Sequence, residues 1–211
     1  MRKYLVEFIG TFFLVFTVTC AVLSGAPLAP LGIGAVLMVM VFAGGHISGG
    51  HFNPAVTLAV LLRGRITSAE AVPYWVTQLV AGVVAALLGK YVIDPKNQPP
   101  ATELTGGHLI VAALLAELLF TFALAWVVLN VATSKDHPNN SFYGLAIGFT
   151  VLAGAVAVGG VSGGAFNPAV ALGIMTAGIS AWKNIWIFWL AELAGAALAA
   201  YAFKAANPDD A

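Results

Sequence analysis

The sequence contains few charged residues. Asp, Glu, Lys and Arg together make up 9% of its 211 residues, and 60% are hydrophobic, whereas a typical soluble domain is about 25% charged. So few charges cannot cover a surface that faces water, and we therefore expect lipid to be the solvent of this chain. The 9 basic and 9 acidic residues balance, so no basic field is available for binding nucleic acid.

Cysteine is almost absent as well. The single Cys20 lies in an apolar run, which excludes a disulfide framework and a cysteine-ligated metal site. We interpret it as a small packing residue. Three of the histidines, His51, His108 and His137, lack the spacing of metal ligands. We therefore expect neither a metal nor another cofactor.

Long apolar runs dominate the chain instead. A helix that crosses a bilayer needs about 20 apolar residues, and six runs approach that length: 4–26, 31–46, 69–93, 108–132, 142–160 and 182–204. The first run follows a short basic start, but it is too long for a signal peptide and has no clear cleavage site, so we interpret it as the first span. The linkers at 94–107 and 133–140 are short, and we expect the tail at 207–211 to be frayed.

Two further apolar segments, 54–62 and 168–177, are too short to cross a membrane. Each follows a glycine-rich stretch and begins at a proline, which suits the first position of a helix. Such a segment reaches only about 15 Å, half the hydrocarbon core. We therefore predict two half-helices, entered through non-helical backbone, which membranes tolerate only where protein buries it or water lines it.

The half-helices belong to an internal repeat. The sequences SGGHFNPAV at 48–56 and SGGAFNPAV at 162–170 lie 114 positions apart. We expect a single domain over 1–211, with repeat one at about 1–93 and repeat two at about 107–205. Each repeat holds three spans, an odd number, so the second repeat is inverted in the membrane relative to the first. Sites in such proteins lie at the repeat interface near the bilayer midplane.

The distribution of Lys and Arg favours one orientation, because cytoplasmic loops carry an excess of them. With the N-terminus inside, the cytoplasmic side holds Arg2, Lys3, Arg63, Arg65, Lys135 and Lys204, and the outside holds Lys90, Lys96 and Lys183. We therefore expect an integral multi-pass membrane protein with both termini in the cytoplasm.

The inverted repeat would point the N-terminal ends of the half-helices at each other. Each end carries about half a positive charge and unpaired N–H groups, so the pair repels cations and hydronium but not a neutral dipole. Asn53 and Asn167 stand at the N-cap positions, where an Asn amide can still donate to a passing molecule. One Asn-Pro-Ala could be a plain helix cap, but two at matching places indicate a polar passage.

The repeated segments resemble the two signature loops of the aquaporin (major intrinsic protein) family, and the resemblance covers nearly the whole chain. It implies an all-α membrane protein with an aquaporin-like inverted repeat: six transmembrane helices in a right-handed bundle plus two re-entrant half-helices, with one pore per subunit of a homotetramer. The motif residues that would line the pore are Asn53, Pro54, Ala55, Asn167, Pro168 and Ala169. The loop backbone that would line it belongs to Gly49, Gly50, His51, Ser162 and Gly163.

The resemblance also places the family's narrowest point outside the Asn-Pro-Ala pair. By spacing from the motifs, its four positions fall on Ile33, Ala155, Gly164 and Val170, where water-selective members have an aromatic residue, a His, a small residue and an Arg. Val170 has neither the fixed donors nor the permanent charge of an Arg. We expect a wider and more apolar constriction, which admits larger neutral solutes yet offers water few partners and can dewet.

Acidic residues inside a span are candidates for a functional or structural role. The resemblance assigns Glu7 and Glu117 to bracing the re-entrant loops by accepting backbone N–H bonds, and a proton relay is the alternative. Glu192, the pseudo-symmetric partner of Gln78, is expected to pack against a loop or a neighbouring subunit. His46 is either a pore-mouth residue able to respond to pH or a neutral side chain that holds loop backbone.

Together these features predict a passive channel of the aquaporin family in the plasma (cell inner) membrane, and not an enzyme. It would conduct water and other small uncharged solutes and exclude protons and ions, with membrane lipid as its other partner. The alternative is a neutral-solute facilitator for ammonia, hydrogen peroxide, carbon dioxide or glycerol with slow water flux. A secondary transporter also uses inverted repeats but would need an ion site or a titrating acid. A non-conducting structural protein is disfavoured because an unlined polar site in lipid is costly.

Overall fold

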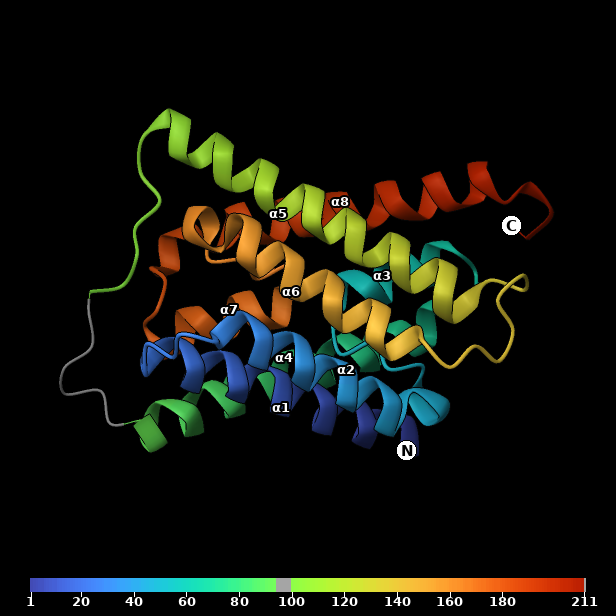
Figure 1. Cartoon of the computed structure of the whole chain (residues 1–211), viewed down its shortest axis with the longest axis horizontal. Helices are drawn as coiled ribbons and strands as arrows, with labels where there is room; N and C mark the ends of the chain where they lie inside the picture. Colours follow the sequence, from blue (N-terminus) through green and yellow to red (C-terminus); the bar gives the residue numbers. More distant parts are fainter. Residues whose placement is uncertain (94–99, 211) are drawn as a thin grey trace.

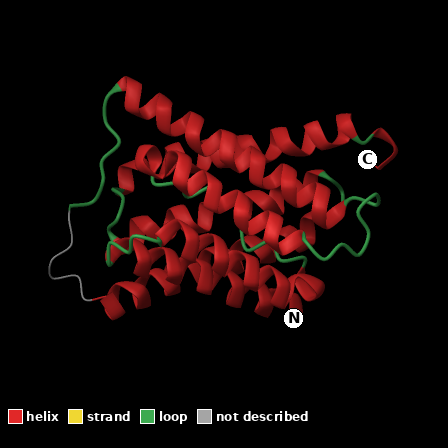
Figure 2. Cartoon of the chain, in the orientation of Figure 1, coloured by secondary structure: helices red, strands yellow, loops and turns green. Residues whose placement is uncertain are grey.

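Helices form nearly all of the computed structural model, which describes residues 1–93 and 100–210. Within these residues, six helices are long and apolar enough to cross a membrane, and they lie in one bundle with loops at its two ends (Figure 1). Their bounds are α1 Arg2–Leu23, α2 Ala29–Ser48, α4 Ser68–Ile93, α5 Gly107–Val128, α6 Tyr143–Ser162 and α8 Ile185–Ala206. A π-helical turn, Leu129–Thr133, extends α5, and a 3₁₀ turn, Trp182–Asn184, precedes α8. Figure 2 shows loops at both ends of the bundle, between the helices.

Each apolar run that we interpreted as a span corresponds to one of these helices, although the first run extends past the end of α1 at Leu23. The half-helices are confirmed as α3 (Pro54–Leu62) and α7 (Pro168–Ala177). Helices α2 and α6 continue past their predicted ends, to Ser48 and Ser162. They end where Gly49 and Gly163 adopt left-handed backbone with φ of 89° and 104°, because a residue without Cβ takes this C-cap conformation easily. Part of the predicted linker, 94–99, lies outside the described residues.

The two repeats pack in equivalent ways and interlock. Helix α1 packs along α4 in the first repeat, as α5 packs along α8 in the second, and each half-helix also contacts the last helix of the other repeat. Between the repeats α2 crosses α6, where a Cβ on Gly34 would lie 2.7 Å from the carbonyl oxygen of Gly148. Small residues let helix backbones approach this closely, so the repeat interface is tight on this side.

The half-helices occupy opposite halves of the bundle. In Figure 1, α3 lies toward the end that carries both chain termini, and α7 lies toward the other end. Both termini lie at one end because the chain traverses the bundle an even number of times. Two helices that enter from opposite ends bring their first turns to the middle of the bundle.

The tail is bound to the bundle, so the prediction that it is frayed was wrong for residues 207–210; residue 211 lies outside the described part. Pro208–Asp210 form a 3₁₀ turn, and the buried Asp210 carboxylate accepts bonds from Arg63 Nη2 at 2.7 Å, Arg65 Nη2 at 3.2 Å and the Lys135 N–H at 3.0 Å. The Arg63 guanidinium is buried too and lies 4.6 Å from the ring centroid of Phe203. A buried cation needs a counterion, and the length and polarity of the tail do not reveal this need.

The first prediction concerns this ion pair. Asp210→Asn keeps the size of the side chain but removes the negative charge beside Arg63, whose side chain is 3% exposed. Because a buried charge without a partner is strongly destabilising, we expect a clearly lower melting temperature. Glu103→Gln is the matched control, since its pair with Lys183 is 58% and 52% exposed and exposed pairs contribute about 0–1 kcal/mol. Equal shifts for the two variants in thermal unfolding would contradict the assignment.

The second prediction concerns pH. Burial acts to raise the pKa of Asp210, but the Lys135 N–H, the Ser134 hydroxyl and the Arg63 guanidinium outweigh it and hold the pKa below its ordinary value. A carboxyl with a lowered folded-state pKa stabilises the fold above its unfolded pKa, about 3.9. This contribution disappears as the pH falls through the lowered folded value. Limited proteolysis should therefore find the tail protected at neutral and mildly acidic pH and released in stronger acid; an Asp210→Asn tail with the same profile would refute this.

Candidate functional site

Asn53 and Asn167 cap the two half-helices with their side-chain oxygens. Asn53 Oδ1 accepts the N–H groups of Ala55 and Val56 at 2.8 and 3.3 Å. The Oδ1 atom of Asn167 caps α7 in the same way, at 2.9 and 3.4 Å. Both asparagines have extended backbone, as N-caps do. Fixing the oxygen also fixes the amide nitrogen, which points away from the helix that its own residue caps.

The two amide nitrogens bond across the repeats. Asn53 Nδ2 donates to the carbonyl oxygen of Phe166 at 2.8 Å, and Asn167 Nδ2 donates to that of Phe52 at 2.9 Å. Each asparagine is 3% exposed, so these bonds lie inside the bundle. An amide nitrogen carries two hydrogens, so each asparagine keeps one further donor after making its bond.

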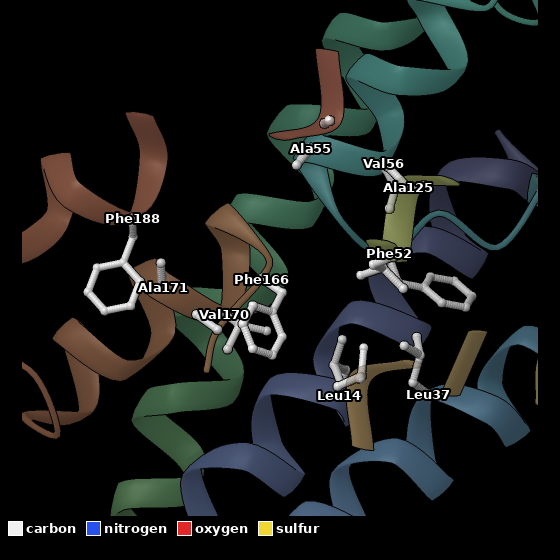
Figure 3. Packing of buried hydrophobic residues seen from close by; sticks show 14 of the residues in the cluster. Leu14, Leu37, Phe52, Ala55, Val56, Ala125, Phe166, Val170, Ala171 and Phe188 are labelled. Atoms are coloured by element: carbon white, nitrogen blue, oxygen red, sulfur yellow. The ribbon is translucent and has the colours of Figure 1, made fainter. Parts of the chain in front are cut away.

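The carbonyls that accept these bonds belong to residues in strained backbone. Phe52 and Phe166 have φ of 48° and 50°, a left-handed conformation that costs a residue with a side chain about 1–2 kcal/mol. Both rings are buried in the apolar core, the same cluster that contains Leu14, Leu37 and Val170 (Figure 3). Strain of this kind persists only where the surroundings determine the conformation.

Buried carboxylates are part of the surroundings of this strained backbone. Glu7 accepts the Phe52 N–H at 2.7 Å and the His51 N–H at 3.0 Å, and it also accepts the Ser48 hydroxyl at 2.7 Å and Gln78 Nε2 at 2.8 Å. These four donors match the roughly four acceptor sites of a carboxylate. That Glu7 braces the first re-entrant loop remains a prediction, but the hydrogen bonds to loop backbone that this role requires are present.

Glu117 holds the second loop with equivalent bonds. It accepts the Ser162 hydroxyl at 2.6 Å and the N–H groups of Ala165 and Phe166 at 3.1 and 2.7 Å. In both loops the amides turn toward a carboxylate on a neighbouring helix. The carbonyls of Phe52 and Phe166 are thereby left to meet the asparagines.

The two candidate histidines have different surroundings. His51 is buried, with Nδ1 3.1 Å from Thr57 Oγ1 and its ring centroid 5.0 Å from that of Tyr74. His46 is exposed and lines a cavity of about 360 Å³ together with residues of the α5–α6 connection. His51 is therefore fixed by its neighbours, whereas His46 is exposed at the end of the bundle that carries both chain termini.

Three cavities lie along the interior. One of about 440 Å³ is lined by the ends of α2 and α6 that lie away from the chain termini and by Val170 and Ile174 of α7. One of about 390 Å³ lies beside Ser48, Gly49, His51 and Arg65. Between them a cavity of about 20 Å³ contains Asn53 and Asn167 in its wall. The cavity that contains the asparagine pair in its wall is therefore much smaller than the other two.

The four positions carried over for the constriction lie together in space. Ile33, Ala155, Gly164 and Val170 all line the 440 Å³ cavity, and all except Ala155 also line the small central one. They come from α2, α6, the second loop and α7. Three of the four positions carry apolar side chains and the fourth is a glycine. That they select among solutes remains a prediction.

The small cavity has further wall residues that the sequence analysis missed: Leu14, Val18, Leu37, Leu124, Val151 and Ala165. In an apolar run a pore-facing leucine looks the same as a lipid-facing one. A usable signal exists in α1, because Glu7, Thr11, Leu14 and Val18 recur at helical spacing and share one buried face. The buried acid therefore marks the face that turns inward.

This fold and site define a multi-pass membrane protein built as an inverted repeat around two polar helix tips. The sequence profile of the family described as Major intrinsic protein matches residues 1–203. The chain is 39% identical to the glycerol uptake facilitator protein-like 6 of Lactiplantibacillus plantarum, with 100% of both chains covered. It is 35% identical to aquaporin NIP1-4 of Oryza sativa subsp. japonica, with 97% of this chain and 76% of the relative covered.

A solved structure has the same fold. The aquaglyceroporin from Plasmodium falciparum superposes with a TM-score of 0.83 at 21% identity, covering 99% of this chain and 98% of that one. The chain therefore belongs to the major intrinsic protein family and is an integral membrane channel of the passive, small-solute kind.

The third prediction concerns the capping asparagines. Asn53→Ala and Asn167→Ala each remove an N-cap, at a cost of about 1 kcal/mol, and leave a buried carbonyl without its donor, at a further cost of about 1–3 kcal/mol. We expect both to lower the free energy of unfolding by similar amounts. Asn130→Ala is the control, since its side chain donates to the carbonyl of Trp126 in its own helix. Denaturant titration measures all three, and a strong effect in only one repeat would contradict the equivalence of the tips.

Proposed function

We propose that the protein conducts water and small uncharged solutes through a path that runs along its three cavities and past Asn53 and Asn167. The observation that carries this proposal is the central cavity, because its wall combines two amide donors with a volume of about 20 Å³. A water molecule needs about 10–15 Å³ by this kind of measure. Solutes would therefore pass the asparagine pair in single file.

Protons and ions would be excluded at the same central cavity, beside Asn53 and Asn167. The N-terminal ends of α3 and α7 each present about half a positive charge. The two Asn oxygens already accept N–H groups of their own helices, and the two amide nitrogens can only donate. A cation arriving there meets two positive helix ends in a site too small for its hydration shell. A neutral molecule that can accept a hydrogen bond meets a partner instead.

Selectivity among neutral solutes would be set on the far side of the asparagines, away from the chain termini. The cavity there is lined by Ile33, Ala155, Gly164 and Val170, none of which carries a charged or amide side chain. The chain's likeness to a glycerol uptake facilitator-like protein supports a range of solutes wider than water.

The second candidate is a neutral-solute facilitator with slow water flux. Ammonia, hydrogen peroxide, carbon dioxide and glycerol are its solutes. The apolar walls of the central cavity favour it, because a narrow apolar segment can dewet and slow water. Its distinguishing property is a higher ratio of solute flux to osmotic water flux than a strict water channel has.

A proton-coupled transporter is disfavoured by the surroundings of Glu7. All four of its acceptor sites are occupied by donors, so protonation would break a bond that holds the first loop. Passive conduction needs no such step and no covalent chemistry, and on this reading the protein is not an enzyme.

The proposed setting is the plasma (cell inner) membrane, with both termini in the cytoplasm. The excess of Lys and Arg at the terminal-bearing end supports this orientation. A homotetramer with one pore in each subunit is proposed from the resemblance to the family. On this assignment the 390 Å³ cavity that contains His51 and Arg65 opens to the cytoplasm.

Stopped-flow light scattering on proteoliposomes tests the proposal. Vesicles that contain the protein should shrink and reswell faster than empty vesicles under water, glycerol and ammonia gradients, with proton flux unchanged. Fast solute flux with slow water flux would select the facilitator. Flux that depends on an imposed pH or sodium gradient, or rates equal to those of empty vesicles, would refute passive conduction.

The fourth prediction concerns Val170, which lines both the central and the 440 Å³ cavity. Val170→Arg should narrow the path and add a fixed charge, lowering glycerol flux by at least about tenfold, or about 1.4 kcal/mol of barrier. Val170→Leu is the control, because it adds volume without charge. Solute-induced swelling of proteoliposomes measures both variants, and glycerol flux unchanged by Val170→Arg would show that position 170 does not face the path.

A further inference from the structure

Glu192 on α8 is a fully buried acid with one oxygen unused. Its Oε1 accepts the N–H of Asn167 at 3.0 Å, and among the described residues its Oε2 has no hydrogen-bond partner. A carboxylate oxygen without a partner away from water is unfavourable. A protonated carboxyl, by contrast, has a hydrogen to donate.

Glu117 lies on α5, the helix that packs along α8, and it binds the same loop as Glu192. Glu117 accepts the N–H groups of Ala165 and Phe166, and Glu192 accepts that of Asn167, so both carboxyls lie against three consecutive amides of the second loop. Helices α3 and α7, which also pack on α8, contain no ionisable side chain. The ionisable residues of the 3₁₀ turns that contact α8 lie at its two ends.

The first repeat shows what the position requires. There Gln78, the counterpart of Glu192, donates from Nε2 to Glu7 Oε2 at 2.8 Å and completes a set of four donors. Glu117 has three donors, the Ser162 hydroxyl and two backbone amides. An ionised Glu192 cannot serve as the fourth donor to Glu117, whereas a protonated Glu192 can. Two ionised carboxylates facing each other in a dry interior are strongly unfavourable, and such pairs hold one proton between them.

We propose that Glu192 is a positioning residue that carries a proton and donates it to Glu117, so that the pair holds one proton and one negative charge. The proton completes the donor set of Glu117, which fixes the amides of Ala165 and Phe166. The carbonyl of Phe166 then stays turned toward Asn53 Nδ2. The second loop thus uses a protonated acid where the first loop uses an amide.

Infrared spectroscopy of the full chain in lipid at neutral pH tests this directly, because a protonated carboxyl has a carbonyl stretch separate from those of carboxylate and amide. We expect the wild type to show one acid band that Glu192→Gln removes. Gln78→Glu should add a second such band in the first repeat. A wild-type spectrum without an acid band, or an acid band that survives in Glu192→Gln, overturns the proposal. The readout does not depend on which solute the channel conducts.

Thermal unfolding separates a proton donor from a simple packing residue. Glu192→Gln keeps a donor for Glu117 and an acceptor for the Asn167 N–H, so it should retain the wild-type melting temperature. Glu192→Leu keeps neither and should lower it. If Glu192→Gln destabilises the protein as much as Glu192→Leu does, the carboxyl is not acting as a neutral donor and the proposal fails.

Discussion

The two half-helices are held tip to tip by a pair of hydrogen bonds that cross between the repeats. Asn53 Nδ2 donates to the Phe166 carbonyl and Asn167 Nδ2 to the Phe52 carbonyl, at 2.8 and 2.9 Å. Each asparagine also caps its own helix. One side chain therefore starts a helix, joins the two repeats and keeps one amide hydrogen as a donor toward the central cavity. The remaining structure serves to keep these two tips in this position.

The tips need support because their backbone is unfavourable on its own. Phe52 and Phe166 have left-handed φ values, and the buried carboxylates Glu7 and Glu117 accept the N–H groups of these residues and of the residues just before them. The acids are thus part of the scaffold of the polar passage. This arrangement also explains why these two acids lie so deep in apolar helices: both are fully buried, and Glu7 accepts four hydrogen bonds and Glu117 three.

The sequence was informative where local chemistry decides the structure. Pro54 and Pro168 mark helix starts, and the two copies of the motif require that the half-helices meet. It was silent where a contact joins distant segments. Nothing near Asp210 indicates that it is the counterion of Arg63, and nothing in an apolar run separates Leu124 or Val151, which line the central cavity, from residues that face lipid.

The central claim is that the two asparagine amides face one wet passage at the middle of the bundle. A high-resolution structure in a lipid bilayer, with ordered water resolved, tests it most directly. The account predicts a continuous file of density between the two end cavities, with a water or solute within hydrogen-bond distance of both Asn53 Nδ2 and Asn167 Nδ2. Amides that are separated, or sealed in a gap with no water on either side, would contradict it.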